Sequence, residues 1–171
     1  MKKITAEELI RVLGLDVLPV EGGHFRQTYK ADETVAVTRS GPEIPLLKPR
    51  STAILYLLSA DPDSFSAIHR LPTDEIYHFY LGDPVEMLLL RPDGDSEVVV
   101  LGHDLLDGQH VQFAVPAGVW QGSRVAPDGE FALMGTTMAP GFVDEDYIPG
   151  HRDGLIEQYP DRAGLIRLLT R

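Results

Sequence analysis

The sequence predicts an all-β fold, a sandwich or barrel of antiparallel strands, with short helices at its N-terminal and C-terminal ends. Short apolar or alternating segments recur between residues 25 and 138 at intervals of roughly 8–12 residues, as in all-β domains. Turn sequences separate them, such as the Pro-Asp-Gly sequences at 92–94 and 127–129. The strand patterns do not alternate with helical patterns, so a parallel sheet of βαβ units is disfavoured.

The N-terminal helix is predicted at residues 5–13. Thr5 is a suitable N-cap, and Glu8 follows three residues later, which completes a capping-box pattern. The apolar residues that come next have helical spacing, and Gly14 is expected to end the helix.

Apolar, β-branched and aromatic residues mark the candidate strands. The segment 51–59 is an apolar run, long enough for a buried strand, whereas residues 41–49 contain three prolines and are predicted to form a loop. The predicted strands are 25–29, 35–38, 51–59, 66–70, 75–81, 85–91, 96–101, 111–115, 120–125 and 131–138.

The C-terminal segment changes to a helical period. Residues 154–170 are predicted to form helices that cover an outer face of the sheets, with Pro160 at the start of the last one, where proline is tolerated. A length of 171 residues fits a single domain over 1–171, since domains cluster at about 100–150 residues.

The composition narrows the possible partners. With 26 acidic and 15 basic residues, the formal net charge is −11, which argues against nucleic acid and anionic membranes. The chain has no cysteine, so disulfides and thiolate metal sites are excluded and a cytoplasmic location is favoured. The N-terminal segment lacks the apolar core of a signal peptide, and no apolar run is long enough to span a membrane.

His69 and Glu75 form the densest chemical signal. His69 ends one predicted strand and Glu75 begins the next, so a short turn brings both side chains to one end of neighbouring strands. Imidazole and carboxylate suit a divalent iron, manganese, nickel or zinc ion, and equally a base with its orienting partner. A plain surface pair at the mouth of a hairpin is the alternative.

The two-residue period of a strand constrains their neighbours. If Glu75 points inward, Tyr77, Phe79 and Leu81 do so as well, and His78 faces the other way. A second feature lies at 115–121, where a tight turn containing Pro116 and Gly118 leads into a strand. That strand carries Trp120, the only tryptophan, and Gln121.

Together these features resemble the two sequence motifs of cupins. His69, Glu75 and Gly82 match the first motif, but its second histidine is replaced by Leu71. The turn at 116–118 matches the second motif, whose final histidine is replaced by Gln121.

The chain is most similar to the Cupin_5 group, formerly a domain of unknown function. The matching segments are 21–29, 69–84, 115–121 and 139–142. The resemblance implies a cupin double-stranded β-helix, or jelly roll, over residues 25–147, commonly dimeric and related to RmlC-type sugar-nucleotide epimerases. It implies no established activity.

Three functions follow for a small, carbohydrate-like ligand in the barrel. In an RmlC-like epimerase or isomerase, His69 is the base, Glu75 orients it, and Tyr77 or Tyr56 is the acid. Arg26, if it points inward, anchors an anionic or hydroxylated substrate.

In a metal-dependent cupin, an oxygenase or isomerase, His69, Glu75 and Gln121 hold a single divalent ion, although an amide oxygen is a poor ligand for a transition metal. In a binding protein without turnover, the barrel wall of Tyr77, Phe79 and Trp120 holds the ligand. A homodimer is expected, because jelly rolls leave open sheet edges.

Overall fold

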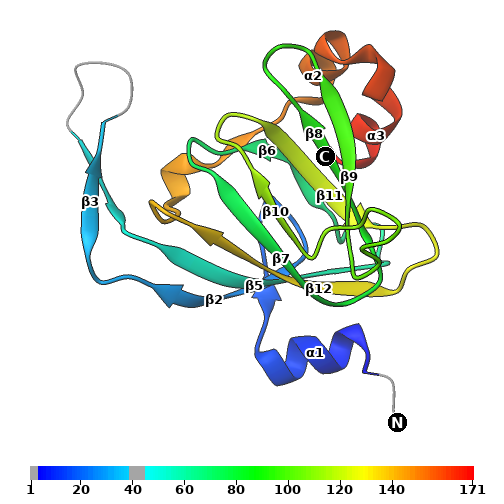
Figure 1. Cartoon of the computed structure of the whole chain (residues 1–171), viewed down its shortest axis with the longest axis horizontal. Coiled ribbons are helices and arrows are strands. Elements are labelled where there is room, and N and C mark those ends of the chain that lie inside the picture. Colours follow the sequence, from blue (N-terminus) through cyan, green and yellow to red (C-terminus); the bar gives the residue numbers. More distant parts are fainter. Residues whose placement is uncertain (1–3, 39–44) are drawn as a thin grey trace.

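The computed structural model describes residues 4–38 and 45–171, and two antiparallel sheets face each other in it as a jelly roll with short terminal helices (Figure 1). The predicted fold class is therefore confirmed. One sheet has, in spatial order, β1 (Asp16–Val17), β2 (His24–Lys30), β5 (Thr52–Ser59), β12 (Phe131–Met138), β7 (Glu75–Gly82) and β10 (Gln112–Val115). The other has β13 (Ile148–Pro149), β6 (Ser66–Arg70), β11 (Trp120–Val125), β8 (Val85–Leu90) and β9 (Ser96–Leu101).

The N-terminal helix is α1 (Ala6–Leu13), with the predicted capping box between Thr5 and Glu8. Gly14 ends it in the left-handed region, at a φ of 60°. The helix lies against the outer face of the six-stranded sheet, where its apolar side packs on Leu57, Phe131 and Leu133. Burial of these side chains holds the helix, since eight residues are too few for a stable helix in isolation.

The C-terminal segment forms α2 (Arg152–Gln158), the 3₁₀ turn η2 (Pro160–Arg162) and α3 (Ala163–Leu168), shown in orange to red in Figure 1. These elements cover the outer face of the five-stranded sheet, as predicted. Their apolar residues pack on the outward side chains of β6 and β8 in one cluster: Ile68, Leu88, Leu90, Leu155, Tyr159, Ile166 and Leu169.

The main core lies between the two sheets. Inward side chains from both sheets fill it, which is the arrangement expected of an antiparallel sandwich. Its fully buried members include Leu58, Phe79, Val85, Met87, Leu89, Leu101, Ala132 and Met134.

The predicted loop at 41–49 is wrong for its second half. Residues 39–44 lie outside the described part of the chain, but Leu46–Pro49 forms β4, which pairs with β3 (Thr34–Val37) in a separate two-stranded ribbon. Pro49 stands at the last position of that strand, opposite Thr34, where a missing N–H costs the ladder little. The three prolines therefore led to a predicted loop that is too long.

A bulge in β7 overturns the predicted inward position of Leu81. In the pairing of β7 with β12, Phe79 lies opposite Met134 and Leu81 lies opposite Leu133, so Tyr80 is an extra residue. Phe79 consequently faces the core between the sheets, whereas Leu81 packs with Leu133 under α1. The two-residue period holds only up to the bulge.

The remaining predicted strands agree with the structure to within one or two residues at their ends. β1 and β13 were not predicted, because two residues are too short to show a period. Among the described residues, no helix combines the length and apolar character needed to cross a bilayer.

Candidate active site

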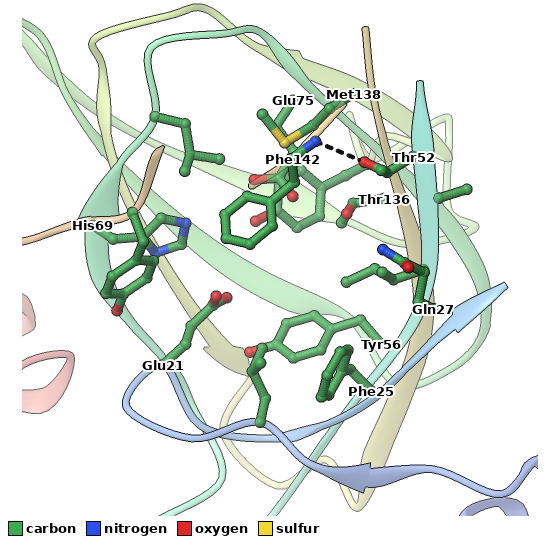
Figure 2. Close-up of a pocket in the computed structure, with 16 residues that line it drawn as sticks. Glu21, Phe25, Gln27, Thr52, Tyr56, His69, Glu75, Thr136, Met138 and Phe142 are labelled. Carbon is green, nitrogen blue, oxygen red and sulfur yellow. Dashed lines mark hydrogen bonds between the residues drawn. The ribbon is translucent and has the colours of Figure 1, made fainter. Parts of the chain in front are cut away.

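A cavity of about 90 Å³ lies between the two sheets at one end of the barrel (Figure 2). One water molecule needs roughly 10–15 Å³ by this measure, so the space suits a small organic molecule. The polar side chains that line it come from distant parts of the chain: Glu21, Gln27, Thr52, Tyr56, His69, Glu75, Tyr77, Thr136 and Tyr147.

His69 lies on β6 and is 2% exposed. Its Nδ1 is 2.8 Å from the backbone oxygen of Ala67, which can only accept, so Nδ1 carries the proton. When the ring is neutral, its lone pair is therefore at Nε2, as a base requires. The ring of Tyr147 stacks on it, with centroids 5.0 Å apart and planes at 24°.

Glu75 begins β7 and is 7% exposed. Its Oε2 accepts a hydrogen bond of 2.7 Å from Nε2 of Gln121. Burial raises the pKa of Glu75, the charge of His69 opposes that rise, and the charge of Glu21 adds to it. This carboxyl group therefore keeps its proton to higher pH than an exposed glutamate.

Tyr56 and Tyr77 are buried phenols on β5 and β7. Burial raises the pKa of both well above the ordinary value, and the charges of Glu21 and Glu75 raise it further. Both groups thus stay protonated and can donate. The hydroxyl of Tyr56 donates to the backbone oxygen of Gly22 at 3.0 Å, and a side-chain hydrogen bond with Glu75 also raises the pKa of Tyr77.

Gln121 joins the two predicted residues. It lies on β11 opposite His69, and its Nε2 is 3.4 Å from Nε2 of His69 as well as 2.7 Å from Glu75. Gln121 is not part of the cavity wall itself, and its Oε1 is buried without a hydrogen-bond partner in the described structure. The sequence-predicted group of imidazole, carboxylate and amide is therefore brought together inside the barrel.

Besides Gln121, three more residues expected to bind substrate do not line the cavity. Arg26 is exposed, because its neighbours Phe25 and Gln27 take the inward positions of β2. Trp120 faces outward toward the C-terminal helices, with the guanidinium of Arg70 at 4.6 Å from its ring centroid.

Phe79 does point between the sheets, but it belongs to the packed core beyond the cavity. Its ring meets that of His103 edge to face at a centroid distance of 4.9 Å. His78, as expected, faces away from Glu75, and its Nε2 lies 3.0 Å from Oγ1 of Thr137.

Glu21 and Tyr147 line the cavity and were not predicted as site residues. Glu21 precedes β2, and its Oε1 accepts a hydrogen bond of 2.8 Å from Oγ of Ser66. The hydroxyl of Tyr147 is buried without a hydrogen-bond partner among the described residues. Both stand in irregular segments, where no strand or helix period indicates the direction of a side chain.

The residues present do not fit a transition-metal site. Leu71 lies buried in the cavity wall where a second histidine would be expected. Within residues 4–38 and 45–171, no three His, Cys, Asp or Glu residues are grouped to hold an ion. The amide of Gln121 donates to Glu75, so these two groups satisfy each other rather than sharing a cation.

Two facing antiparallel sheets with a histidine, a glutamate and a glutamine gathered at the interior of one end define a cupin barrel. The match of a family model settles the subgroup. The chain belongs to the Cupin_5 family, described as Cupin superfamily (DUF985), over residues 7–148.

Relatives with substantial identity share this fold. The yeast Saccharomyces cerevisiae has one, Uncharacterized protein YML079W, 31% identical over 135 residues that cover 74% of this chain and 66% of the yeast protein. This chain thus spans slightly less than two thirds of that relative's length. The crystal structure of protein SO0799 from Shewanella oneidensis is 30% identical, with a TM-score of 0.83 and 99% of both chains covered.

A hypothetical protein from Leishmania major is 27% identical, with a TM-score of 0.84 over 98% of this chain and 99% of that one. An oxalate decarboxylase from Bacillus subtilis is 13% identical, with a TM-score of 0.51 over 91% of this chain and 37% of that one. The likeness to the decarboxylase concerns the fold alone.

Proposed function

We propose that this protein binds a small, hydroxylated, carbohydrate-like molecule in the barrel and acts on it as an epimerase or isomerase. The observation that carries the proposal is the meeting of three groups at one enclosed cavity: an imidazole with its lone pair at Nε2, a carboxyl group of raised pKa, and buried phenols. Cavities of this kind, with convergent polar groups and shifted pKa values, are typical of active sites.

The reaction begins at a carbon beside a carbonyl group. Nε2 of His69 takes the proton from that carbon, the C–H electron pair forms an enediol double bond, and the carbonyl oxygen receives a proton from Tyr77 or from protonated Glu75. For the isomer, His69 returns its proton to the former carbonyl carbon, and the neighbouring hydroxyl gives its proton to the Tyr77 phenolate as the new carbonyl forms. For the epimer, protonated Glu75 delivers a proton to the opposite face of the carbon, the enediol oxygen returns its proton to Tyr77, and water carries the proton held by His69 back to Glu75.

Two other functions are alternatives that the experiments below distinguish from the proposal. Binding without turnover is the second candidate, and its support is the hydrogen bond between Gln121 and Glu75, which satisfies part of the polar group without any ligand. A metal-dependent reaction has less support, because Leu71 and Gln121 stand where imidazole ligands would be needed.

The test is deuterium wash-in. The protein is incubated in D₂O with a panel of ketoses and aldoses, and exchange at the carbon beside the carbonyl is followed by NMR. We expect exchange with at least one sugar and a loss of about 100-fold or more in His69→Asn, since a positioned general base contributes about 10²–10⁴-fold. The control is His151→Asn, because His151 is exposed and away from the cavity.

A circular dichroism spectrum and a melting curve show whether each variant is folded. If folded His69→Asn exchanges the same sugar at the wild-type rate, His69 has no role as base. If no sugar exchanges but some bind, the protein is a binder. If exchange appears only after loading with iron, manganese, nickel or zinc, the metal-dependent alternative replaces the proposal.

We further propose that the protein is a homodimer and acts in the cytoplasm. Support for the dimer is the open edge of β2, since β1 pairs only with His24 and Phe25. Support for the location is the absence of cysteine from the sequence. Fluorescence microscopy of a tagged full-length chain tests the location.

A further inference from the structure

We propose that the ligand of the barrel is a positively charged amino polyol, a hydroxylated molecule that carries an ammonium group, and that the cavity rejects anions. The inference rests on the proposed function, because it names the ligand class of the same site. It differs from the expectation that Arg26 would anchor an anionic substrate.

Apart from the imidazole of His69, the titratable side chains of the cavity wall are acids. Glu21 and Glu75 line it, and Figure 2 shows the Glu21 carboxylate directed inward toward Tyr56 and the side of the cavity occupied by His69. Among the described residues, no lysine or arginine lines the cavity. An anion in the cavity would lose its hydration without gaining a lysine or arginine as a partner. An ammonium ion would instead be able to pair with a carboxylate.

The cations found close behind the wall are already engaged. Lys48, which is 1% exposed, forms an ion pair of 2.6 Å with Asp146, the residue before Tyr147. Arg171 donates to the backbone oxygens of Val20 and Asp63, and its guanidinium lies 4.7 Å from the ring centroid of Phe65. Asp146 thus neutralises the charge of Lys48, and Arg171 is an exposed side chain that does not line the cavity.

Aromatic rings make up much of the rest of the wall. Phe25, Tyr56 and Phe142 stand around the space in Figure 2, and Tyr77 and Tyr147 complete the group. The faces of such rings carry negative electrostatic potential and attract an organic cation, most strongly where water is excluded. Aromatic walls and two carboxyl groups together favour an ammonium group over a neutral or acidic one.

Glu21 is the side chain best placed to receive the ammonium group. Only its Oε1 is used in the described structure, as the acceptor of the Ser66 hydroxyl. Its charge is also felt across the cavity, where after burial it contributes to raising the pKa of Glu75 and of Tyr77. A ligand cation beside it opposes this effect, so binding should lower the pKa of Glu75 and release a proton at any pH where Glu75 is still protonated.

Hydroxyl and amide groups on the wall account for the polyol part. Gln27, Thr52 and Thr136 line the cavity on β2, β5 and β12. Oγ1 of Thr52 accepts a hydrogen bond of 2.9 Å from the backbone N–H of Phe142, and its own proton remains for a ligand oxygen. Neutral donors and acceptors of this kind bind hydroxyl groups.

The test uses two matched sets of probes with different charge. The three-carbon set is 2-amino-1,3-propanediol, glycerol and glycerate, and the six-carbon set is glucosamine, glucose and glucuronate. Isothermal titration calorimetry at pH 7 measures affinity. We expect the amine to bind at least about tenfold more tightly than the neutral probe in one set, and the acid not to bind. Repeating the titration in buffers of different ionisation enthalpy should reveal proton release.

The Glu21→Gln variant is expected to lose the preference for the amine while it keeps the affinity for the neutral probe. The amide oxygen can still accept from Ser66, so the fold of the turn is retained, and a melting curve confirms this. Glu157→Gln, at an exposed position on α2, is the control and should keep the preference.

The outcomes separate this inference from the proposed function. Equal binding of amine and neutral probes, or tighter binding of the acid, overturns the inference and leaves exchange chemistry intact. Preference for the amine without deuterium exchange into any sugar, amino sugars included, supports the inference and contradicts the epimerase. Binding of neither set, together with no exchange, overturns both.

Discussion

Gln121 links the histidine and the glutamate of the candidate site. It stands where the second cupin motif would have a histidine, and its amide N–H donates to Glu75 at 2.7 Å and lies 3.4 Å from His69. In a metal site an ion would bridge the imidazole and the carboxylate. Here the neutral amide of Gln121 lies between His69 and Glu75. Glu75 is thus left to change its protonation state, and His69 to act through a lone pair.

Glu75 should make the stability of the protein fall as the pH rises. Burial raises its pKa above the ordinary value of 4.5. The contribution of Glu75 to the free energy of unfolding is therefore fully present below its pKa in the unfolded chain. It is lost as the pH rises through the higher pKa that Glu75 has in the folded protein. Relative to Glu75→Gln, the wild-type free energy of unfolding should decline by up to about 1.4 kcal/mol per pH unit in that window.

Urea unfolding from pH 4 to pH 9 measures this difference. Glu75→Gln keeps an acceptor for Gln121, so it should match or exceed the wild type at pH 8. Glu157→Gln, on the surface, should follow the wild-type curve throughout. A constant difference between Glu75→Gln and the wild type at all pH values would show that Glu75 does not titrate with folding.

A single substitution should convert the site into a metal site. Gln121→His places a second imidazole beside His69 and Glu75, which restores three ligands of the type that divalent iron, nickel and zinc prefer. We expect metal affinity to rise at least about tenfold over the wild type, by calorimetry with Ni²⁺ and Zn²⁺. Gln158→His, at an exposed position of α2, is the control. Equal affinity in all three proteins would contradict the account of the donor set.

How far the site was predictable differs from residue to residue. His69, Glu75 and Gln121 follow from motif spacing, because they lie on strands whose alternation fixes direction. On β2 the same alternation turns Arg26 away from the cavity between Phe25 and Gln27, and on β11 it turns Trp120 outward. Glu21 and Tyr147 lie in segments without a period, and only tertiary packing brings them to the cavity.

At the scale of elements, the two-stranded ribbon is tied to the site through one ion pair. Lys48 on β4 is 1% exposed and pairs at 2.6 Å with Asp146, which is 0% exposed and belongs to the 3₁₀ turn η1 (Asp144–Asp146). Lys48 also donates to Oγ1 of Thr73 at 3.2 Å. Because Tyr147 follows directly and stacks on His69, this buried pair positions part of the cavity wall.

Breaking that pair should be costly. Lys48→Met leaves Asp146 buried without its ammonium partner, and such losses typically cost about 3–5 kcal/mol. Urea unfolding at pH 7 measures the loss. Lys30→Met, at an exposed position of β2, should cost less than about 0.5 kcal/mol.

Adding Asp146→Asn to Lys48→Met should recover part of the stability, because it removes the buried charge. If Lys48→Met unfolds at the same urea concentration as the wild type, the pair has no structural role. If the double variant is less stable than Lys48→Met by the full cost of a second independent change, the two side chains do not act on each other.

Local features explain where the predicted elements failed. The alternation along β7 predicted Phe79 correctly and Leu81 wrongly, because the bulge at Tyr80 depends on the pairing with β12. Proline content favoured a loop at 41–49, but an edge ribbon accepts prolines at its strand ends, so Leu46–Pro49 pairs with β3. The helix at Ala6–Leu13 was predictable throughout, since its cap, its apolar face and Gly14 are local signals.

At the scale of the whole molecule, the two sheets are covered on their outer faces by helices from opposite ends of the chain (Figure 1). The sheet edges are covered less evenly. Strand β1 pairs with only two residues of β2, so the rest of β2 from Arg26 to Lys30 runs exposed along the rim. An uncovered edge of this kind favours pairing with a second copy of the chain.

We expect multi-angle light scattering to give a dimer at micromolar concentration. Tyr29→Glu, on the exposed part of β2, should raise the dissociation constant at least about tenfold by removing an apolar contact and adding a charge. Leu106→Glu, in a fully exposed loop, should leave it unchanged. A wild-type monomer at high micromolar concentration would refute the dimer.

The placement of α2 and α3 has a consequence for biosynthesis. Strands β6, β8, β9 and β11 are all translated before residue 126, yet the apolar outer face they form stays bare until residues 152–168 leave the ribosome. During that interval the nascent chain presents Ile68, Leu88 and Leu90 to solvent, where chaperones recognise such surfaces. A pause in translation after β12 would prolong the exposure.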